Sequence, residues 1–237
     1  MSEKVDSIKE IDPFILEAYR ELVTNIKFSS FDKKIKTIFI TSSIQGEGKT
    51  TTALNLAITL AKGGDRVLLI DCDLKRPNIH KKLNISNLTG LSNLILDFEK
   101  LDEIINKNIV DNLDVLTSGE KVTNTLELLN SKKMYSLIEK LKDQYDYIIL
   151  DTPPVGVIAD AKVVSQYSDG GLFVVSKDNI NRNIAIKAKD MLEKVNANIL
   201  GVVLTKEIIN KDKKSYYGYY EENRKEEGKK RFKFLRR

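Results

Sequence analysis

Residues 37–51 read TIFITSSIQGEGKTT, an apolar run that leads through a turn with two glycines into a helical segment. A strand, such a turn and a helix N-terminus together surround a phosphate with backbone N–H groups and the positive end of a helix dipole. The phosphate-loop pattern G-x-x-x-x-G-K-[ST] is met except at its first glycine, where Ser43 stands. In this pattern Lys49 reaches the β- and γ-phosphates and Thr50 ligates Mg²⁺. We therefore expect a nucleotide site formed by Gly46, Glu47, Gly48, Lys49, Thr50 and Thr51.

Short apolar runs rich in β-branched residues recur along the chain. Each predicts a buried strand, and they span 37–41, 67–70, 113–116, 147–150, 172–175 and 199–204. Helical segments are expected between them at 50–62, 131–144 and 184–195, and an N-terminal helix over 12–28 begins at Asp12-Pro13. This alternation predicts an α/β fold, a mainly parallel central sheet flanked by helices, as in P-loop NTPases.

Charge divides the chain into two parts. Residues 211–237 hold eleven of the 39 Lys/Arg and five of the 34 Asp/Glu, so this stretch has a net charge of +6 and the rest of the chain −1. We expect a folded domain over 1–210 and a flexible, basic, tyrosine-rich tail over 211–237. The folded part is not basic, which argues against a nucleic-acid partner.

The composition also indicates the cellular compartment of the protein. No apolar run is long enough to span a membrane, and the charged N-terminus is followed by no apolar stretch, so we expect a soluble, cytoplasmic protein. The single cysteine, Cys72, suits a reducing compartment.

Acidic residues follow two of the predicted strands. Asp71 and Asp73 come after the strand 67–70, and Asp151 comes after the strand 147–150. Open α/β sheets bind ligands at this end of their strands. One such aspartate usually just forms a turn, but three beside a phosphate loop indicate a Mg²⁺ site. Ile208 stands where guanine recognition would need an aspartate, so ATP is the expected nucleotide.

Four of the nine tyrosines lie within five residues near the C-terminus: Tyr216, Tyr217, Tyr219 and Tyr220. Aromatic side chains usually serve packing or an interface. Here the segment is charged, contains Gly218 and lacks aliphatic residues, so a packing role is disfavoured.

With these motifs in place, the chain resembles the bacterial tyrosine kinases that regulate capsule and exopolysaccharide synthesis, in their cytoplasmic-chain form. The resemblance covers nearly the whole chain. Its most specific part is the combination of the motif DCDLKRP, residues 71–77, with the tyrosine cluster. It also includes EAYR at 17–20, GEGKT at 46–50, DTPP at 151–154 and GVVL at 201–204.

The resemblance implies a protein-tyrosine kinase that uses ATP and Mg²⁺ and autophosphorylates the four clustered tyrosines. Lys49 would neutralise the transferring phosphoryl group, Thr50 and Asp151 would hold the metal, and Asp73 would support it. Asp71 would orient the attacking phenol and accept its proton. The implied partners are protein tyrosine substrates, further copies of the chain, and an activator protein of the polysaccharide-export system embedded in the membrane.

The chain departs from the family pattern at four places. Val23 replaces a second basic residue on the N-terminal helix, and Gln45 replaces a proline in the phosphate loop. Residues 120–125, EKVTNT, stand where a proline-rich turn is expected, and Thr205 stands where an asparagine would read adenine.

Two other classes of function remain open. One is an ATPase that acts as a spatial switch in division-site placement or plasmid partitioning. Such switches carry a second lysine early in the loop, where this chain has Ile44. The other is a non-kinase, ATP-gated scaffold for polysaccharide machinery.

The basic tail is a nucleic-acid patch, a peripheral contact to the inner face of the membrane, or a solvated segment. In the second case phosphorylation of the tyrosines would release it, because each phosphate adds about −1.5 to −2 charges.

Overall fold

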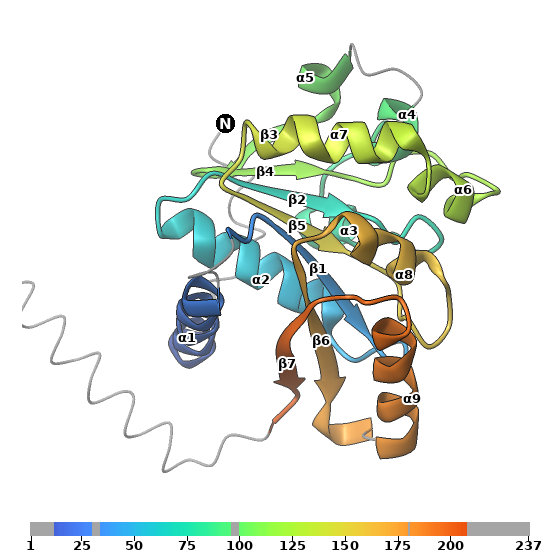
Figure 1. Cartoon of the computed structure of the whole chain (residues 1–237). Coiled ribbons are helices and arrows are strands. Elements are labelled where there is room, and N and C mark those ends of the chain that lie inside the picture. Colours follow the sequence, from blue (N-terminus) through green and yellow to red (C-terminus); the bar gives the residue numbers. More distant parts are fainter. Residues whose placement is uncertain (1–11, 30–33, 96–99, 180, 208–237) are drawn as a thin grey trace, which may run out of the picture.

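The computed structural model describes residues 12–29, 34–95, 100–179 and 181–207. The tyrosine cluster and the rest of the proposed tail, 211–237, lie outside the described residues. The described part is a seven-stranded sheet with helices on both faces (Figure 1). The strand order is β3-β4-β2-β5-β1-β6-β7, and only β3 runs antiparallel to its neighbour. The expected mainly parallel α/β sheet is confirmed.

The predicted strands are all present; β4 is unchanged, β6 is longer by three residues, and each of the others is longer by one. They are β1 Thr37–Ser42, β2 Val67–Asp71, β4 Leu113–Leu116, β5 Tyr147–Asp151, β6 Gly170–Ser176 and β7 Ile199–Thr205. Strand β3, Asn106–Val110, was not predicted. It is a polar edge strand, irregular in register and with Asn108 at a positive φ, so it has no alternating apolar pattern.

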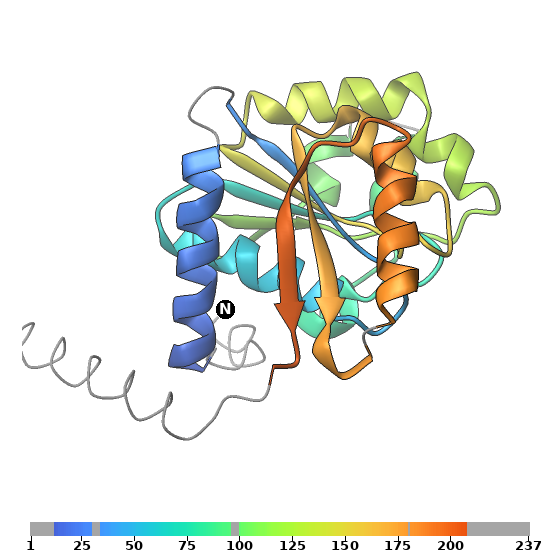
Figure 2. The same ribbon diagram turned by 60° about the horizontal axis from the view of Figure 1, so that its bottom comes forward.

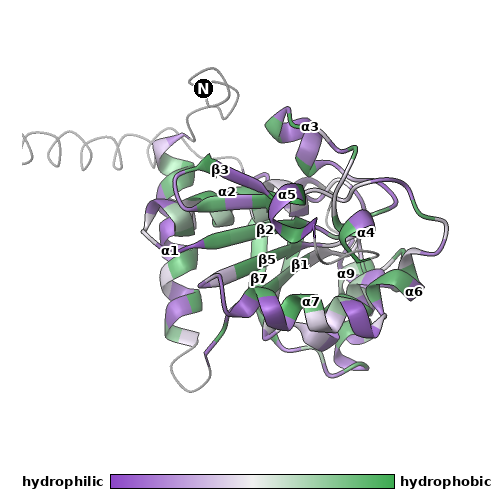
Figure 3. Ribbon diagram, turned by 90° about the horizontal axis from the view of Figure 1, so that it is seen from above, coloured by the Kyte–Doolittle hydropathy of each residue, from purple (hydrophilic) through white to green (hydrophobic). Residues whose placement is uncertain are grey.

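Strands β1, β2, β5 and β6 are buried on both faces. Ile38 and Ile40 of β1 face one apolar cluster, while Phe39 between them faces the other. Side chains alternate across a strand, and this alternation supplies both cores from one run of apolar residues. Seen from above, the central strands are accordingly hydrophobic (Figure 3).

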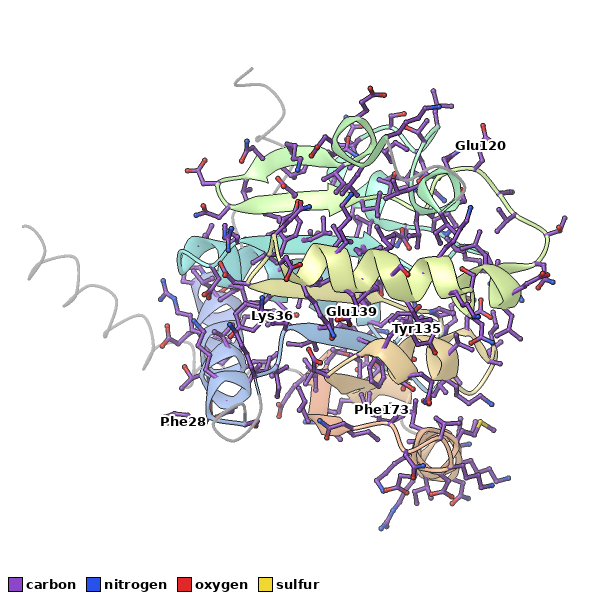
Figure 4. All side chains as sticks on the ribbon, turned by 45° about the horizontal axis from the view of Figure 1, so that its top comes forward. Phe28, Lys36, Glu120, Tyr135, Glu139 and Phe173 are labelled. Atoms are coloured by element: carbon purple, nitrogen blue, oxygen red, sulfur yellow. The ribbon has the colours of Figure 1, made fainter. Side chains whose placement is uncertain are left out.

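The first face of the sheet is covered by α1 Pro13–Ser29, α2 Lys49–Lys62 and α3 Ile79–Leu83. The three longer helices in the described part besides α1 match the expected segments: α2, α7 Lys132–Lys142 and α9 Arg182–Glu193. Helix α1 begins as expected, since the Asp12 carboxylate accepts a hydrogen bond from the N–H of Phe14 at 2.9 Å. Its Phe28 lies at the outer end of the helix, away from the sheet (Figure 4).

The second face is covered by α7 and α9 together with shorter elements. These are α4 Leu91–Leu94, α5 Leu101–Ile104, α6 Thr125–Leu129, α8 Asp160–Val164 and the 3₁₀ turn η2 Ser165–Tyr167. A further 3₁₀ turn, η3 Lys177–Asn179, follows β6. In Figure 2, α9 runs beside β6 and β7 at one edge of the sheet. None of the described helices is both long and apolar enough to cross a lipid bilayer.

Candidate active site

The loop between β1 and α2 has the backbone geometry of a phosphate-binding loop. Gly46 and Gly48 have φ values of 87° and 93°, a left-handed conformation that residues with a side chain rarely adopt. Gly48 is also the N-cap of α2, and no side chain caps the helix there. The first N–H groups of α2 therefore remain available to an anion.

Glu47 fixes the shape of this loop from within. Its carboxylate is buried and accepts hydrogen bonds from the Ser43 hydroxyl at 2.7 Å and the Ile44 N–H at 2.8 Å. The N–H of Ser176, at the end of β6, donates to its other oxygen at 3.4 Å. Serine at the first glycine position of the motif thus has a structural use, as a donor inside the loop.

The three aspartates predicted to form a site lie together. Strands β2 and β5 are neighbours, and Asp71 pairs in register with Asp151. Asp73 follows two residues after Asp71. The side chains of Asp71 and Asp151 are fully buried, and Asp73 is 5% exposed. Two strand ends 80 residues apart in the sequence therefore place their carboxylates beside the phosphate-binding loop.

Lys49 connects the loop to these carboxylates. Its ammonium lies 3.0 Å from Asp73 Oδ2 and 3.8 Å from Asp151 Oδ1. Burial alone would lower the pKa of Lys49, but the nearby carboxylates outweigh it and raise the pKa above its ordinary value. Lys49 is therefore positively charged at neutral pH.

Asp71 is held by the start of α3. Its Oδ2 accepts hydrogen bonds from the N–H groups of Asn78 and Ile79, both at 3.1 Å, and its Oδ1 accepts from Asp73 N at 3.2 Å. Burial, together with the charge of Asp151, raises the pKa of Asp71 above the ordinary aspartate value. A higher pKa makes this carboxylate a better proton acceptor than an exposed aspartate.

Asp151 is the least satisfied polar group of the site. Neither of its carboxylate oxygens meets the geometry of a hydrogen bond with a described residue. Burial raises the pKa of Asp151 and outweighs the opposite effects of Lys49 and the Thr50 hydroxyl. A buried polar atom without a partner is rare in a folded protein and calls for an explanation such as a bound ion.

The donor set fits Mg²⁺. The Asp151 carboxylate accepts no hydrogen bond from a described residue and has the Lys49 ammonium 3.8 Å from Oδ1, and the Thr50 hydroxyl lies 3.5 Å from Lys49 Nζ. Across the described ranges, no group of three or more acidic, imidazole or thiol side chains is arranged to hold a metal unaided. Mg²⁺ bound together with a nucleotide takes only one or two carboxylates and completes its shell with phosphates and water.

Two contacts of the site were not predicted. The Thr205 hydroxyl donates a hydrogen bond to the main-chain oxygen of Glu47 at 2.6 Å, and Arg76 donates from its guanidinium to the Gln45 side chain. Both join loops from distant parts of the sequence, so residue spacing gives no signal for them. The only hint was that Thr205 and Gln45 depart from the family pattern.

The remaining departures also have structural counterparts. Val23 is partly buried and packs on the apolar cluster beneath α1 and α2. In the stretch 120–125, the Asn124 side chain caps α6, and the Thr125 hydroxyl donates to Asp160 of α8 at 2.8 Å. A hydrogen-bonded cap therefore stands where a proline-rich turn was expected.

Residues 35–178 match the family model described as "AAA domain", which accounts for more than half of the chain. The curated relatives include the tyrosine-protein kinase YwqD of Bacillus subtilis (strain 168), which is 38% identical over 220 residues. That alignment covers 93% of this chain and 92% of YwqD. A P-loop domain of this kind binds nucleotide.

Solved structures of P-loop proteins, including a tyrosine-kinase domain, resemble this chain. The kinase domain of the Escherichia coli tyrosine kinase ETK superposes with a TM-score of 0.78 at 31% identity, covering 83% of this chain and 77% of that one. The septum site-determining protein MinD from Pyrococcus horikoshii OT3, solved with Mg-ADP, gives a TM-score of 0.60 at 28% identity. That alignment covers 71% of this chain and 69% of MinD.

Proposed function

The chain belongs to the bacterial tyrosine-protein kinases, and we propose that it transfers the γ-phosphoryl group of ATP to its own C-terminal tyrosines. The acceptors are Tyr216, Tyr217, Tyr219 and Tyr220. This autophosphorylation would regulate capsule or exopolysaccharide synthesis or export. A membrane-embedded protein of the export system is the proposed activator, and it would recruit the chain to the inner face of the membrane.

One observation carries the proposal: Lys49 and three buried aspartates meet at the N-terminus of α2. Phosphoryl transfer needs little covalent help from a protein and depends on positioning and charge neutralisation. The N–H groups at the start of α2 and the Lys49 ammonium supply positive charge for the phosphates. Mg²⁺ held by Thr50 and Asp151, with Asp73 beside them, would neutralise further charge on the phosphates.

The proposed step is a direct displacement of ADP from the γ-phosphorus by a tyrosine oxygen. A tyrosine oxygen forms a bond to the γ-phosphorus, the bond from that phosphorus to ADP breaks, and the phenol proton passes to the carboxylate of Asp71. A phenol has a pKa of about 10 and is a weak nucleophile at neutral pH. The raised pKa of Asp71 suits it to orient the hydroxyl and accept this proton late in the step.

The spatial-switch ATPase is less well supported. Such a switch needs a second lysine early in the loop, and Ile44 occupies that position. The likeness to the kinase domain is also greater than the likeness to MinD, with TM-scores of 0.78 and 0.60.

The test is mass spectrometry of the full chain after incubation with ATP and Mg²⁺, alone and with the cytoplasmic segment of the export protein. We expect a ladder of species spaced by one phosphoryl group that maps to residues 216–220. Lys49→Met should abolish the ladder, whereas Lys62→Met, at the exposed far end of the same helix, should leave it unchanged. A single unmodified mass under both conditions would overturn the proposal, and ADP release without label would favour the switch ATPase.

A further inference from the structure

A basic surface lies beside the candidate active site, on the turn after β2 and on α3. Residues 74–96 contain four Lys/Arg and no Asp or Glu. Three of these, Lys75, Lys81 and Lys82, are exposed, and we call them the α3 basic surface. None of the three side chains forms a hydrogen bond or an ion pair with another described residue. Their charges are therefore available to a partner.

Helix α3 places this surface next to Asp71. Helix α3 starts at the N–H groups that bind Asp71, and Lys82 N donates to the carbonyl of Asn78 at 3.1 Å, one turn further on. The Lys82 ammonium is near enough to act electrostatically on the Asp151 carboxylate. A ligand on this surface would thus adjoin the proposed proton acceptor.

Neighbouring charges do not cancel the surface. Arg76, in the same turn, is already engaged with Gln45 of the phosphate-binding loop. The loop after β4 adds one exposed acid, Glu120, and one exposed base, Lys121, which offset each other. Asp73 is buried and paired with Lys49. Among the described residues, no acidic side chain pairs with the three lysines.

The tyrosine segment itself has the complementary charge, within a tail that is basic as a whole. Residues 215–223, SYYGYYEEN, contain two acids and no base, and Glu221 directly follows Tyr220. We propose that the α3 basic surface docks the acidic end of this segment, Glu221 and Glu222, and so presents the preceding tyrosines to Asp71. The inference rests on the proposed function, because it concerns how the acceptor reaches the same site.

The same surface would bind the segment more tightly as modification proceeds. Each phosphotyrosine adds about −1.5 to −2 charges and three strong acceptor oxygens, and ammonium groups pair well with phosphate. A segment that carries one phosphate would therefore stay docked while its remaining tyrosines react.

Peptide binding tests the inference without any transfer step. A fluorescent peptide of residues 215–223 is titrated with the full chain in ADP and Mg²⁺, and its anisotropy gives the Kd. The chain carries Glu221→Gln and Glu222→Gln so that its own tail competes less. Replacing Lys75, Lys81 and Lys82 by Ala should raise the Kd about tenfold, as expected for several exposed charge pairs. The peptide phosphorylated at Tyr220 should bind the unsubstituted surface severalfold tighter.

Two controls separate a local effect from a change in total charge. A second triple variant, Lys132→Ala, Lys140→Ala and Lys187→Ala, removes the same charge from exposed positions on α7 and α9 and should leave the Kd unchanged. A peptide with Glu221→Gln and Glu222→Gln should bind weakly to the unsubstituted surface, and the loss of the three α3 lysines should weaken it no further. The Kd for ADP and the melting temperature check that the α3 variant is folded.

Equal peptide affinity in the two triple variants would overturn the inference. The inference would also be overturned if the same lysines bound phosphatidylserine vesicles but not the peptide. If the tail is phosphorylated regardless of these lysines, this inference alone fails. If the chain binds the peptide through them and phosphorylates no tyrosine, the proposed function alone fails.

Discussion

The hydroxyl of Thr205 donates a hydrogen bond to the main-chain oxygen of Glu47, which joins the end of β7 to the phosphate-binding loop at 2.6 Å. The same side chain abuts Gly48, since a Cβ at position 48 would lie 3.3 Å from Thr205 Cγ2. Thr205 therefore braces the two loop residues that lead into α2. It does so two residues before the end of the last described segment, which precedes the tyrosine segment in the chain.

Thr205→Val should weaken nucleotide binding. Valine keeps the shape of threonine but removes the hydrogen bond, which is worth about 0.5–1.5 kcal/mol, so the Kd for ADP should rise about two- to tenfold. Calorimetric titration measures it. Thr205→Ser keeps the hydroxyl and should bind ADP nearly as tightly as the wild type. Equal affinity in the valine variant would show that the brace is unimportant for binding.

Asp151→Asn should stabilise the nucleotide-free and metal-free protein while abolishing kinase activity. The carboxylate is fully buried, accepts no hydrogen bond from a described residue and shares Lys49 with Asp73. Neutralising it should raise the free energy of unfolding by about 1 kcal/mol, because a buried charge is costly.

Asp71→Asn is the matched contrast for this prediction. Asp71 is equally buried and pairs with Asp151 in the sheet, yet it accepts three backbone N–H bonds. Asparagine has one acceptor oxygen and would set its amide N–H₂ against at least one of these N–H groups, which outweighs the removal of a buried charge. The replacement should therefore lower the free energy of unfolding by about 1–3 kcal/mol. Urea denaturation of both variants measures the difference, and the same sign for both would contradict the account of the site.

Asp169→Asn should reduce stability at neutral pH more than at acidic pH. Asp169 Oδ2 accepts hydrogen bonds from Lys36 N at 2.9 Å and from the N–H and hydroxyl of Thr37, both at 2.8 Å. Burial alone would raise the pKa of Asp169, but these donors outweigh it and hold the pKa below the ordinary value. The stabilisation is therefore present above the unfolded-state pKa of about 3.9 and disappears as the pH falls through the folded-state pKa.

At pH 7 this substitution should cost about 1–3 kcal/mol of unfolding free energy. The difference from the wild type should shrink steadily below about pH 4. Denaturation at a series of pH values checks it, with the exposed Asp111→Asn as a control that changes little at any pH. A penalty that does not depend on pH would mean that the charge of Asp169 is irrelevant.

Gly171→Ala should destabilise the packing between β6 and β1. A Cβ at position 171 would lie 2.1 Å from the Phe39 ring, which is itself buried. Such overpacking costs about 1–3 kcal/mol. Gly201→Ala on the neighbouring strand meets nothing within 4 Å and should change stability by about 0.5 kcal/mol or less.

The double variant Gly171→Ala with Phe39→Leu tests the cause. The smaller side chain makes room for the methyl group, so the penalty of the two changes should be smaller than the sum of the single penalties. Thermal unfolding of the wild type, the two single variants and the double variant measures these penalties. If the two penalties simply add, the strain does not come from the contact between residue 171 and the Phe39 ring.

The sequence predicted β1, β2, β5 and β6 well because each is buried on both faces and therefore appears as a mostly apolar run. It failed where local composition and tertiary packing disagree. Gly170 and Gly171 begin β6 because Leu200 and the Phe39 ring approach them closely, yet glycines usually indicate a turn. The five short helices α3, α4, α5, α6 and α8 have only four or five residues each, too few to show a helical period.

The site could be predicted in outline but not in its contacts. Aspartates after two strands were expected at the same edge of the sheet, and the register of Asp71 with Asp151 brings them together. Nothing in the spacing predicts that Lys49 pairs with Asp73 or that Thr205 meets Glu47, because such contacts depend on strand order. The roles assigned to these residues remain predictions.

The strand order means that the nucleotide site cannot be completed until late in synthesis of the chain. β1 lies between β5 and β6, so both its neighbours in the sheet are synthesised long after it. About 100 residues separate the phosphate-binding loop from Asp151, which is roughly 5–20 s of translation at 5–20 residues per second. During that interval the emerging chain has a phosphate loop but lacks the carboxylate that would hold the metal. A nascent chain should therefore gain nucleotide affinity only after β5 and β6 have left the ribosome, and a stop codon before residue 151 should yield a fragment that binds no nucleotide.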